Sequence, residues 1–214
     1  LWIPKLCNTL AKKGLTALRF DFSGNGASEG RFENANCEKE KQDLHTVITS
    51  LNKRYKKIAT IGHSMGGTIT LMNPAEAQSI KAVIAIAPAI HTEKVERKLL
   101  TKKEKEELHK KGKTRIHILN KHYTLTKQFF TAFEKQKVLN NIKKTKAKIL
   151  IIHGSEDHTI PIEESKTLAK LYSAGHRKSA AKKEAQKLNF CVLYINKRGK
   201  RFSKVDFCNI KRKS

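Results

Sequence analysis

The sequence of 214 residues predicts an α/β fold, a mostly parallel sheet flanked by helices, with a charged cap insertion. Short apolar runs typical of buried strands alternate with segments in which apolar residues recur at helical spacing. The pentapeptide Gly-His-Ser-Met-Gly at 62–66 stands between such a run and the start of a helix. Residues 91–147 interrupt the alternation with a stretch that is long for a strand-to-helix connection.

The elements of the first half follow from local signals. A helix is expected over 3–13 and ends at Gly14, and a strand is expected over 15–20. A glycine-rich loop follows over 21–30. Residues 33–53 are expected to form a helix, because apolar residues recur there at helical spacing: Leu44, Val47, Ile48 and Leu51.

The remaining elements surround the pentapeptide and follow it. The apolar run at 57–61 predicts a buried strand, and a helix should begin near residue 67 and stop before Pro74. Further elements are expected later in the chain: strands at 82–87, 148–153 and 190–195, a helix within 93–111, and a helix over 161–171.

The long charged segment sets the predicted domain boundaries. Residues 1–90 and 148–202 are expected to form the core, residues 91–147 a cap or lid over the functional edge of the sheet, and residues 203–214 a basic tail. The alternative for residues 91–147 is a poorly ordered charged insertion.

The charge of the chain is strongly basic and uneven. The formal net charge is +26, and residues 91–148 and 170–214 each carry a net +12. Such segments attract polyanions without sequence preference. No nucleic-acid-binding signature accompanies the charge, so a lysine-rich solvated surface without a specific partner is the favoured reading, and weak non-specific polyanion binding is the alternative.

Other compositional features narrow the class of protein. The four cysteines form no C-x-x-C pair, so neither a metal site nor a disulfide framework is expected, and no cofactor is predicted. No apolar run reaches the length of a membrane span, and the first residues do not resemble a signal peptide. These features predict a cytoplasmic protein without a transmembrane segment. Its oligomeric state is not predicted.

The pentapeptide itself carries chemistry. It has the G-x-S-x-G form of a nucleophile elbow, a tight strand-to-helix turn that holds a serine hydroxyl above the sheet edge. Ser64 is therefore the candidate nucleophile. The alternative is a glycine-rich turn that only packs a helix onto a strand.

Four blocks of sequence resemble the α/β-hydrolase superfamily, in its esterase, lipase and serine-aminopeptidase-like branch. They are Arg-Phe-Asp-Phe-Ser-Gly-Asn-Gly-Ala-Ser-Glu-Gly at 19–30, the segment 42–48 before the elbow, the elbow at 62–67, and His-Gly-Ser-Glu-Asp at 153–157 followed by Ile-Pro at 160–161. The resemblance implies that Ser64 is the nucleophile, Asp157 the acid of a triad, and the Met65 backbone N–H an oxyanion donor. A turn-capping role is the alternative for Asp157.

The chain departs from this family where the catalytic histidine should follow the last strand. Lys200 occupies that position, and no histidine occurs after His176. Lys200 and His176 are the candidate bases. Lys200 needs a depressed pKa to act as one, and His176 needs a rearranged loop. His158, beside the acid, reads as a surface histidine.

A second departure concerns the sheet. In the family, an earlier strand lies between the strand expected at 15–20 and the elbow strand, and a loop next to it supplies the second oxyanion N–H. The chain starts after both, so we expect missing upstream sequence and unpaired strand edges.

The leading functional hypothesis is a serine hydrolase with Ser64 as nucleophile. Its substrate would be a small molecule with an acyl group: a carboxylic ester, a thioester or a small peptide. Its activity is expected to be weak, because a free serine hydroxyl is a poor nucleophile without a base. The alternatives are a non-catalytic remnant of the hydrolase fold and a basic polyanion-binding protein.

Overall fold

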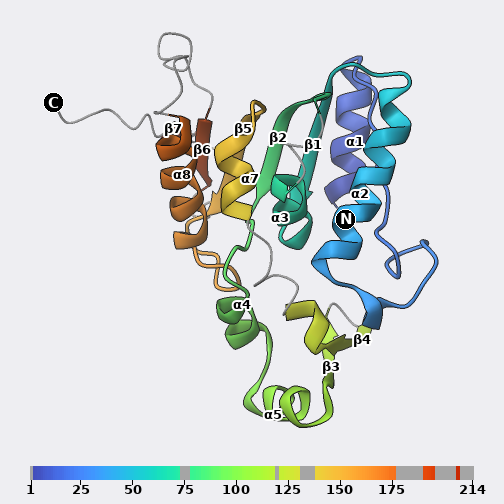
Figure 1. The fold of residues 1–214 in the computed structure, drawn as a ribbon, viewed down its shortest axis with the longest axis vertical. Helices are drawn as coiled ribbons and strands as arrows, with labels where there is room; N and C mark the ends of the chain where they lie inside the picture. The colour runs from blue at the N-terminus through green and yellow to red at the C-terminus, as the bar shows by residue number, and fades with distance from the viewer. Residues whose placement is uncertain are drawn as a thin grey trace, which may run out of the picture.

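A computed structural model describes residues 2–72, 78–118, 121–130, 138–176, 190–195 and 206–207. Its main sheet has the strand order β1-β2-β5-β6-β7 (Figure 1). The first four strands are parallel and β7 pairs antiparallel to β6. The strands are β1 (Ile58–His63), β2 (Ile80–Ile86), β5 (Lys148–Gly154), β6 (Phe190–Ile195) and β7 (Asp206–Phe207).

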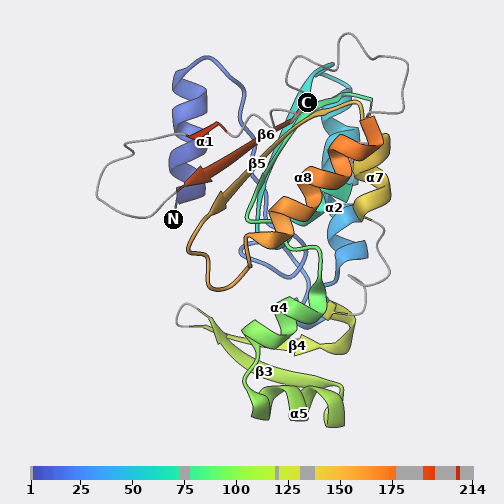
Figure 2. The same cartoon turned by 90° about the vertical axis from the view of Figure 1, so that its left-hand side faces the viewer.

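Helices cover both faces of this sheet. Four of them form one layer: α2 (Cys37–Asn52), α3 (Met65–Met72), α7 (Val138–Lys144) and α8 (Glu163–His176). Helix α1 (Trp2–Lys12) lies on the opposite face (Figure 2). A short 3₁₀ helix, η1 (Phe32–Asn34), precedes α2. The predicted α/β class is therefore confirmed.

The core lies between the sheet and the four-helix layer. Strands β2 and β5 are nearly continuous apolar runs, in which alternate side chains are buried and most of those between them are partly buried. The fully buried side chains at the centre of this layer include Ile69, Leu71, Met72, Val83, Ile151 and Leu168. This packing fixes the end of β1, where the elbow lies, against the end of β2.

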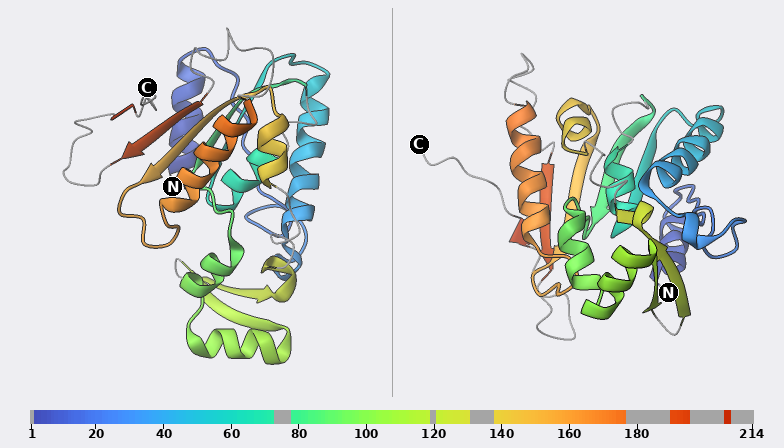
Figure 3. Two further views of the ribbon diagram at one scale, coloured as in Figure 1. Left: turned by 60° about the vertical axis from the view of Figure 1, so that its left-hand side comes forward. Right: turned by 60° about the horizontal axis from the view of Figure 1, so that its bottom comes forward.

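The segment predicted as a cap contains α4 (Thr92–Leu99), α5 (Lys102–Lys111) and the antiparallel hairpin of β3 (Lys113–Ile118) and β4 (Lys121–Thr126). These elements lie beyond the carboxyl edge of the main sheet (Figures 1 and 3). They enclose a small apolar cluster of their own: Leu100, Leu108, Ile116, Leu125 and Phe130. The exact domain boundaries stay a prediction.

The single helix predicted within 93–111 is wrong, because the structure has two. Thr101 begins α5 with a capping box, in which its hydroxyl accepts from the Glu104 N–H and the Glu104 carboxylate accepts from the Thr101 N–H. A residue at such a cap adopts an extended backbone, so the helical pattern is interrupted there.

The strand predicted over 15–20 is also wrong. The residues are exposed and form no strand in the structure. A strand requires a hydrogen-bonded neighbour, and no described strand pairs with this segment. Among the described strands, β1 has β2 as its one neighbour.

Within the described residues, no helix combines the length and apolar composition that crossing a bilayer requires.

Candidate active site

The predicted nucleophile lies at a strand-to-helix turn of a single residue. Strand β1 ends at His63 and α3 begins at Met65, with Ser64 between them. Ser64 has a φ of 53°, in the left-handed region that non-glycine residues rarely occupy. Strained backbone of this kind occurs where the surrounding structure enforces it, often at functional sites.

Glycines make this turn sterically feasible. A Cβ placed on Gly62 would collide with the carbonyl of Gly66 and lie 2.7 Å from the Gly67 nitrogen. A Cβ on Gly67 would lie 3.1 Å from the Gly62 oxygen and 3.2 Å from the Ile86 oxygen. The first turn of α3 therefore packs directly on β1 and on the end of β2.

The Met65 N–H remains as a candidate oxyanion donor once the backbone hydrogen bonds of the turn are assigned. The Ser64 N–H donates to Ile86 O at 2.8 Å, and Thr68 N donates to Ser64 O at 3.1 Å. The Met65 N–H is in the first turn of α3, where N–H groups have no acceptor within the helix. It donates to no acceptor in the described part of the chain, so it is free to stabilise a developing negative charge.

The predicted acid follows β5 on the same edge of the sheet. Strands β1, β2 and β5 are parallel, and their register aligns His63 with Ile86 and Ile86 with Ile152. The carboxyl ends that carry Ser64 and Asp157 therefore meet at one edge, two strand spacings or about 10 Å apart.

The Asp157 carboxylate is oriented by the loop that contains it. Its Oδ1 accepts from the N–H groups of Thr159 and Ile160, each at 2.9 Å. Its Oδ2 lies 3.6 Å from His153 Nε2, which is beyond hydrogen-bond length. Oδ1 thus caps the turn, which is the alternative role considered for Asp157. Oδ2 makes no hydrogen bond among the described residues and could accept one from a base.

His153, at the end of β5, holds this loop in place. The side chain is buried, with Nε2 2.9 Å from Ile160 O and Nδ1 2.6 Å from Ser165 Oγ. Because a carbonyl oxygen only accepts, Nε2 carries the proton and Nδ1 accepts from the serine hydroxyl. Both nitrogens are occupied, so His153 supports Asp157 rather than acting as the base.

The loop after β2 lies at the carboxyl edge of the sheet, between the strands that carry Ser64 and Asp157. Ala87 has a φ of 45°, and its N–H donates to Ile152 O at 2.8 Å. The buried Glu164 carboxylate accepts from the N–H groups of Ile90 and His91 at 2.9 Å and from Lys94 Nζ at 3.1 Å. Helix α8 thereby fixes both this loop and the beginning of α4.

The described residues do not place a candidate base beside Ser64. Lys200 lies outside the described residues. His176 is the last residue of α8, about 20 Å along that helix from its start near the site. Across the described residues, no histidine nitrogen is hydrogen-bonded to the Ser64 hydroxyl.

His63 is the histidine closest in sequence to the nucleophile. Its ring meets Trp2 of α1 edge to face, with ring centroids 5.8 Å apart. Desolvation by neighbouring atoms lowers the pKa of His63; the nearby Asp157 carboxylate opposes this and His153 adds to it. His63 therefore favours the neutral form. The effect of Asp157 on the pKa of His63 agrees with the position of both residues at one edge of the sheet.

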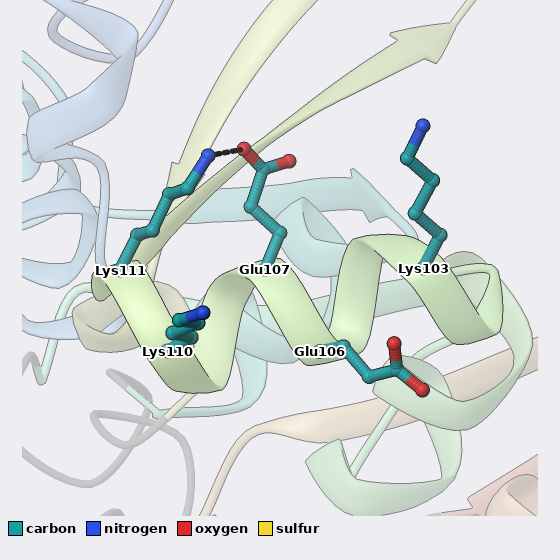
Figure 4. Close-up of a pocket in the computed structure, with 5 residues that line it drawn as sticks. All are labelled: Lys103, Glu106, Glu107, Lys110 and Lys111. Atoms are coloured by element: carbon teal, nitrogen blue, oxygen red, sulfur yellow. Dashed lines mark hydrogen bonds and ion pairs between the residues drawn. The ribbon is translucent and has the colours of Figure 1, made fainter.

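Two surface hollows lie away from this edge. One, of about 480 Å³, is lined by residues of α5 alone, whose side chains project to solvent or pair with each other, as Lys111 does with Glu107 (Figure 4). The other, of about 710 Å³, lies between residues 16–19 and 50–55. Neither hollow includes a predicted catalytic residue. In the described part of the chain, no cluster of three or more histidine, cysteine or acidic side chains could hold a metal ion.

Comparison with known families agrees with this geometry. The profile of the family described as "Serine aminopeptidase, S33" matches residues 2–111, about half of the chain. The chain belongs to this family of α/β-hydrolases. The family match includes the elbow, and the resemblance inferred from the sequence is thereby confirmed.

The curated relatives of this chain include a thioesterase and a transferase by name. The human mitochondrial palmitoyl-protein thioesterase ABHD10 is 26% identical over 173 residues, which cover 79% of this chain and 55% of that protein. The polyketide transferase grgF of Penicillium is 31% identical over 93 residues, 41% of this chain and 32% of the relative. The chain thus spans about half or less of the length of these curated relatives.

Solved structures share the fold. Est1E from Butyrivibrio proteoclasticus, with ferulic acid bound, superposes with a TM-score of 0.70 at 24% identity, covering 91% of this chain and 72% of that structure. A monoacylglycerol lipase from Paleococcus ferrophilus superposes with a TM-score of 0.62 at 19% identity, covering 90% and 78%.

Proposed function

We propose that the protein is a serine hydrolase of acyl esters, thioesters or small peptides, with Ser64 as the nucleophile. The observation that carries the proposal is the left-handed backbone of Ser64, enforced between β1 and α3 beside the free N–H of Met65. A turn that served packing alone would have no need of a strained serine beside an unused donor.

The proposed chemistry has two stages. Ser64 Oγ attacks the acyl carbon while a base takes its proton, and the Met65 N–H stabilises the negative charge on the carbonyl oxygen. The alcohol, thiol or amine then leaves with the proton, which gives an acyl-serine. Water attacks this intermediate, and the acid product leaves as Ser64 is restored. Asp157 Oδ2 would orient the base through both stages.

The rate is expected to be low because of the base. Lys200 stands where the family's histidine is expected, with Lys197, Arg198 and Arg201 close to it in sequence. Neighbouring cations depress a lysine pKa only modestly, whereas a working base requires a large shift. Lys200 and His176 remain the candidate bases. Loss of a triad histidine lowers turnover by roughly four to six orders of magnitude.

The names of the relatives support the substrate class. They include a palmitoyl-protein thioesterase, the protein Est1E with ferulic acid bound, and a monoacylglycerol lipase. What these names share is an acyl group bonded to oxygen or sulfur. We therefore propose this chemistry for Ser64, with residues 91–147 acting as a cap over the acyl chain.

Turnover of p-nitrophenyl butyrate and of a butyryl thioester tests the proposal. Ser64→Ala should abolish any activity above the rate in buffer, whereas Ser50→Ala, which changes an exposed serine on α2, should leave it unchanged. Activity that survives in Ser64→Ala would show that another group is the nucleophile. His176→Ala and Lys200→Ala would then be compared to identify the base.

A non-catalytic hydrolase-fold protein is the second candidate. The use of Asp157 Oδ1 as a turn cap favours it, because that role requires no chemistry. The same assays distinguish the two candidates: a purified protein with no Ser64-dependent turnover of either substrate fits the second.

A further inference from the structure

Two histidines face each other across the hairpin of β3 and β4 in the predicted cap. The antiparallel register pairs His117 of β3 directly with His122 of β4. Their ring centroids are 4.9 Å apart and the ring planes are inclined by 44°. Both residues are exposed, and among the described residues neither imidazole has a hydrogen-bond partner. The ring nitrogens are therefore open to a ligand from solution.

The hairpin holds these two side chains close together. Residues directly opposite in an antiparallel pair have Cβ atoms about 4.5–5.5 Å apart. The other face of the hairpin carries Ile116 and Leu125, which are buried in one apolar cluster with Leu108 of α5. Because side chains alternate between the faces of a strand, this packing directs His117 and His122 toward solvent. The pair thus stands on a packed element, as a preorganised binding site requires.

The separation of the rings suits a shared metal ion. A metal held by one nitrogen of each imidazole, at about 2.0–2.1 Å, places the two ring centroids about 4.5–5.2 Å apart for angles between about 90° and 109° at the metal. The centroid distance of 4.9 Å lies within this range. Chelation therefore requires rotation of the two side chains but no movement of the strands.

The chemistry of the pair selects the kind of metal ion. Imidazole nitrogen suits Zn²⁺, Ni²⁺ and Cu²⁺, whereas Mg²⁺ and Ca²⁺ prefer oxygen ligands. The next opposed pair on the same face is Arg115 and Thr124, which supplies no carboxylate. The positive charge of Arg115 opposes a cation that is held mainly by charge. The surroundings thus add to the discrimination against Mg²⁺ and Ca²⁺.

We propose that His117 and His122 chelate one divalent transition-metal ion, Zn²⁺, Ni²⁺ or Cu²⁺. Within the described residues no third histidine, cysteine or carboxylate joins the pair, so water fills the remaining coordination positions. The bound ion links β3 to β4 and stabilises the hairpin, because it binds the folded hairpin in preference to the unfolded chain. This binding is independent of catalysis by Ser64.

Titration calorimetry with ZnCl₂ and NiCl₂ tests the proposal, with the full chain purified through a tag that contains no histidine. We expect saturable binding that MgCl₂ does not reproduce. His117→Ala and His122→Ala should each weaken it at least about tenfold, because a single histidine no longer chelates. His109→Ala, which removes an exposed histidine of α5, should leave the affinity unchanged. No binding by the unmodified chain, or equal affinity in His117→Ala and His122→Ala, would overturn the proposal.

Relocation of the pair gives a sharper test. Opposed pairs in an antiparallel ladder alternate between two separations, so Arg115 and Thr124, two positions along, have the same kind of separation as His117 and His122. Arg115→His and Thr124→His together should restore binding to a chain that carries His117→Ala and His122→Ala. Arg115→His alone in that chain should not, which controls for the removed positive charge. Failure of the relocated pair to bind would contradict chelation across the strands.

Hydrogen exchange shows where the ion binds. Saturating ZnCl₂ should slow amide exchange in β3 and β4 of the unmodified chain, because the ion joins the two strands. The chain with both His117→Ala and His122→Ala should show no such slowing. Slowing confined to other elements, or equal slowing in that variant, would contradict a site that joins β3 to β4.

Discussion

Gly62 shows how closely the backbone approaches itself at the elbow. Its missing side chain leaves the space that the Gly66 carbonyl occupies. Gly62→Ala should therefore lower the free energy of unfolding by about 3 kcal/mol, at the upper end of the range for overpacking. Urea denaturation measures the difference.

Gly154 provides the matched control, because it also lies at the carboxyl end of a strand. A Cβ there would meet no atom of the described residues within 4 Å, and its φ is not in the left-handed region. Gly154→Ala should change stability by less than about 0.5 kcal/mol. Similar effects for the two substitutions would contradict the close approach at Gly62.

Glu40 is a buried carboxyl group whose Oε2 has no hydrogen-bond partner. Burial, and secondly the charge of Asp43, raises its pKa from 4.5 to about 8. Between these values the folded protein holds a proton that the unfolded chain has lost. Its contribution to stability is therefore complete below about pH 4.5 and is lost as the pH rises through 8.

Glu40→Gln should remove this dependence. The free energy of unfolding of the unmodified protein should fall relative to that of the variant between pH 5 and pH 8, by at most about 1.4 kcal/mol per pH unit. The exposed Glu38→Gln should not alter the slope. Parallel pH curves for the protein and Glu40→Gln would show that Glu40 is not protonated in the fold.

At the scale of elements, the buried Glu164 joins α8 to the loop after β2 and to α4. Glu164→Ala would leave the Ile90 and His91 N–H groups without their acceptor and remove the partner of Lys94. The Glu164 carboxylate is buried whereas Lys94 is partly exposed, so the main cost is that of the unpaired N–H groups, about 1–3 kcal/mol for each. Urea denaturation should show this loss, and hydrogen exchange should show faster exchange at Ile90 and His91.

The neighbouring Glu163 is a matched control on the same helix. Its side chain is exposed and pairs with Lys166 at 3.3 Å. Glu163→Ala should change stability far less than Glu164→Ala does, because exposed ion pairs contribute little. Equal decreases in the free energy of unfolding for Glu163→Ala and Glu164→Ala would contradict the proposal that Glu164 holds α8, the loop after β2 and α4 together.

The strands show how much of the fold could be predicted from the sequence. Strands β1, β2, β5 and β6 are apolar runs with clear limits, so all four were found. The hairpin of β3 and β4 was missed because its residues, such as Lys113, Arg115 and Lys121, are charged. The segment 15–20 has the composition of a strand, but strand formation depends on a neighbour that composition does not reveal.

Some residues of the candidate site could be predicted from the sequence and others could not. Ser64, Met65 and Asp157 were predicted because their motifs lie at strand ends, where topology brings them to one edge. The supporting roles of His153 and Glu164 depend on hydrogen bonds to residues that are distant in the sequence, such as Ser165 and Ile90. No spacing rule in the sequence encodes those contacts.

For the whole molecule, the net charge of +26 predicts weak, non-specific binding of polyanions. A labelled single-stranded oligonucleotide should bind at about 20 mM salt and dissociate near about 150 mM, because counterion release makes the affinity fall steeply with salt. Fluorescence anisotropy across a salt series measures this. Tight binding that persists at high salt, or a preference for one sequence, would instead indicate a nucleic-acid function.

The central claim is that Ser64 is a nucleophile, and acyl transfer to the protein tests it most directly. The full chain is incubated with p-nitrophenyl acetate, and peptides are then mapped by mass spectrometry. We predict that an acetyl group accumulates on Ser64 faster than on any other serine, does so equally in Ser50→Ala, and is absent from that peptide in Ser64→Ala. Acetylation of Ser64 no faster than that of exposed serines such as Ser50 would contradict the account.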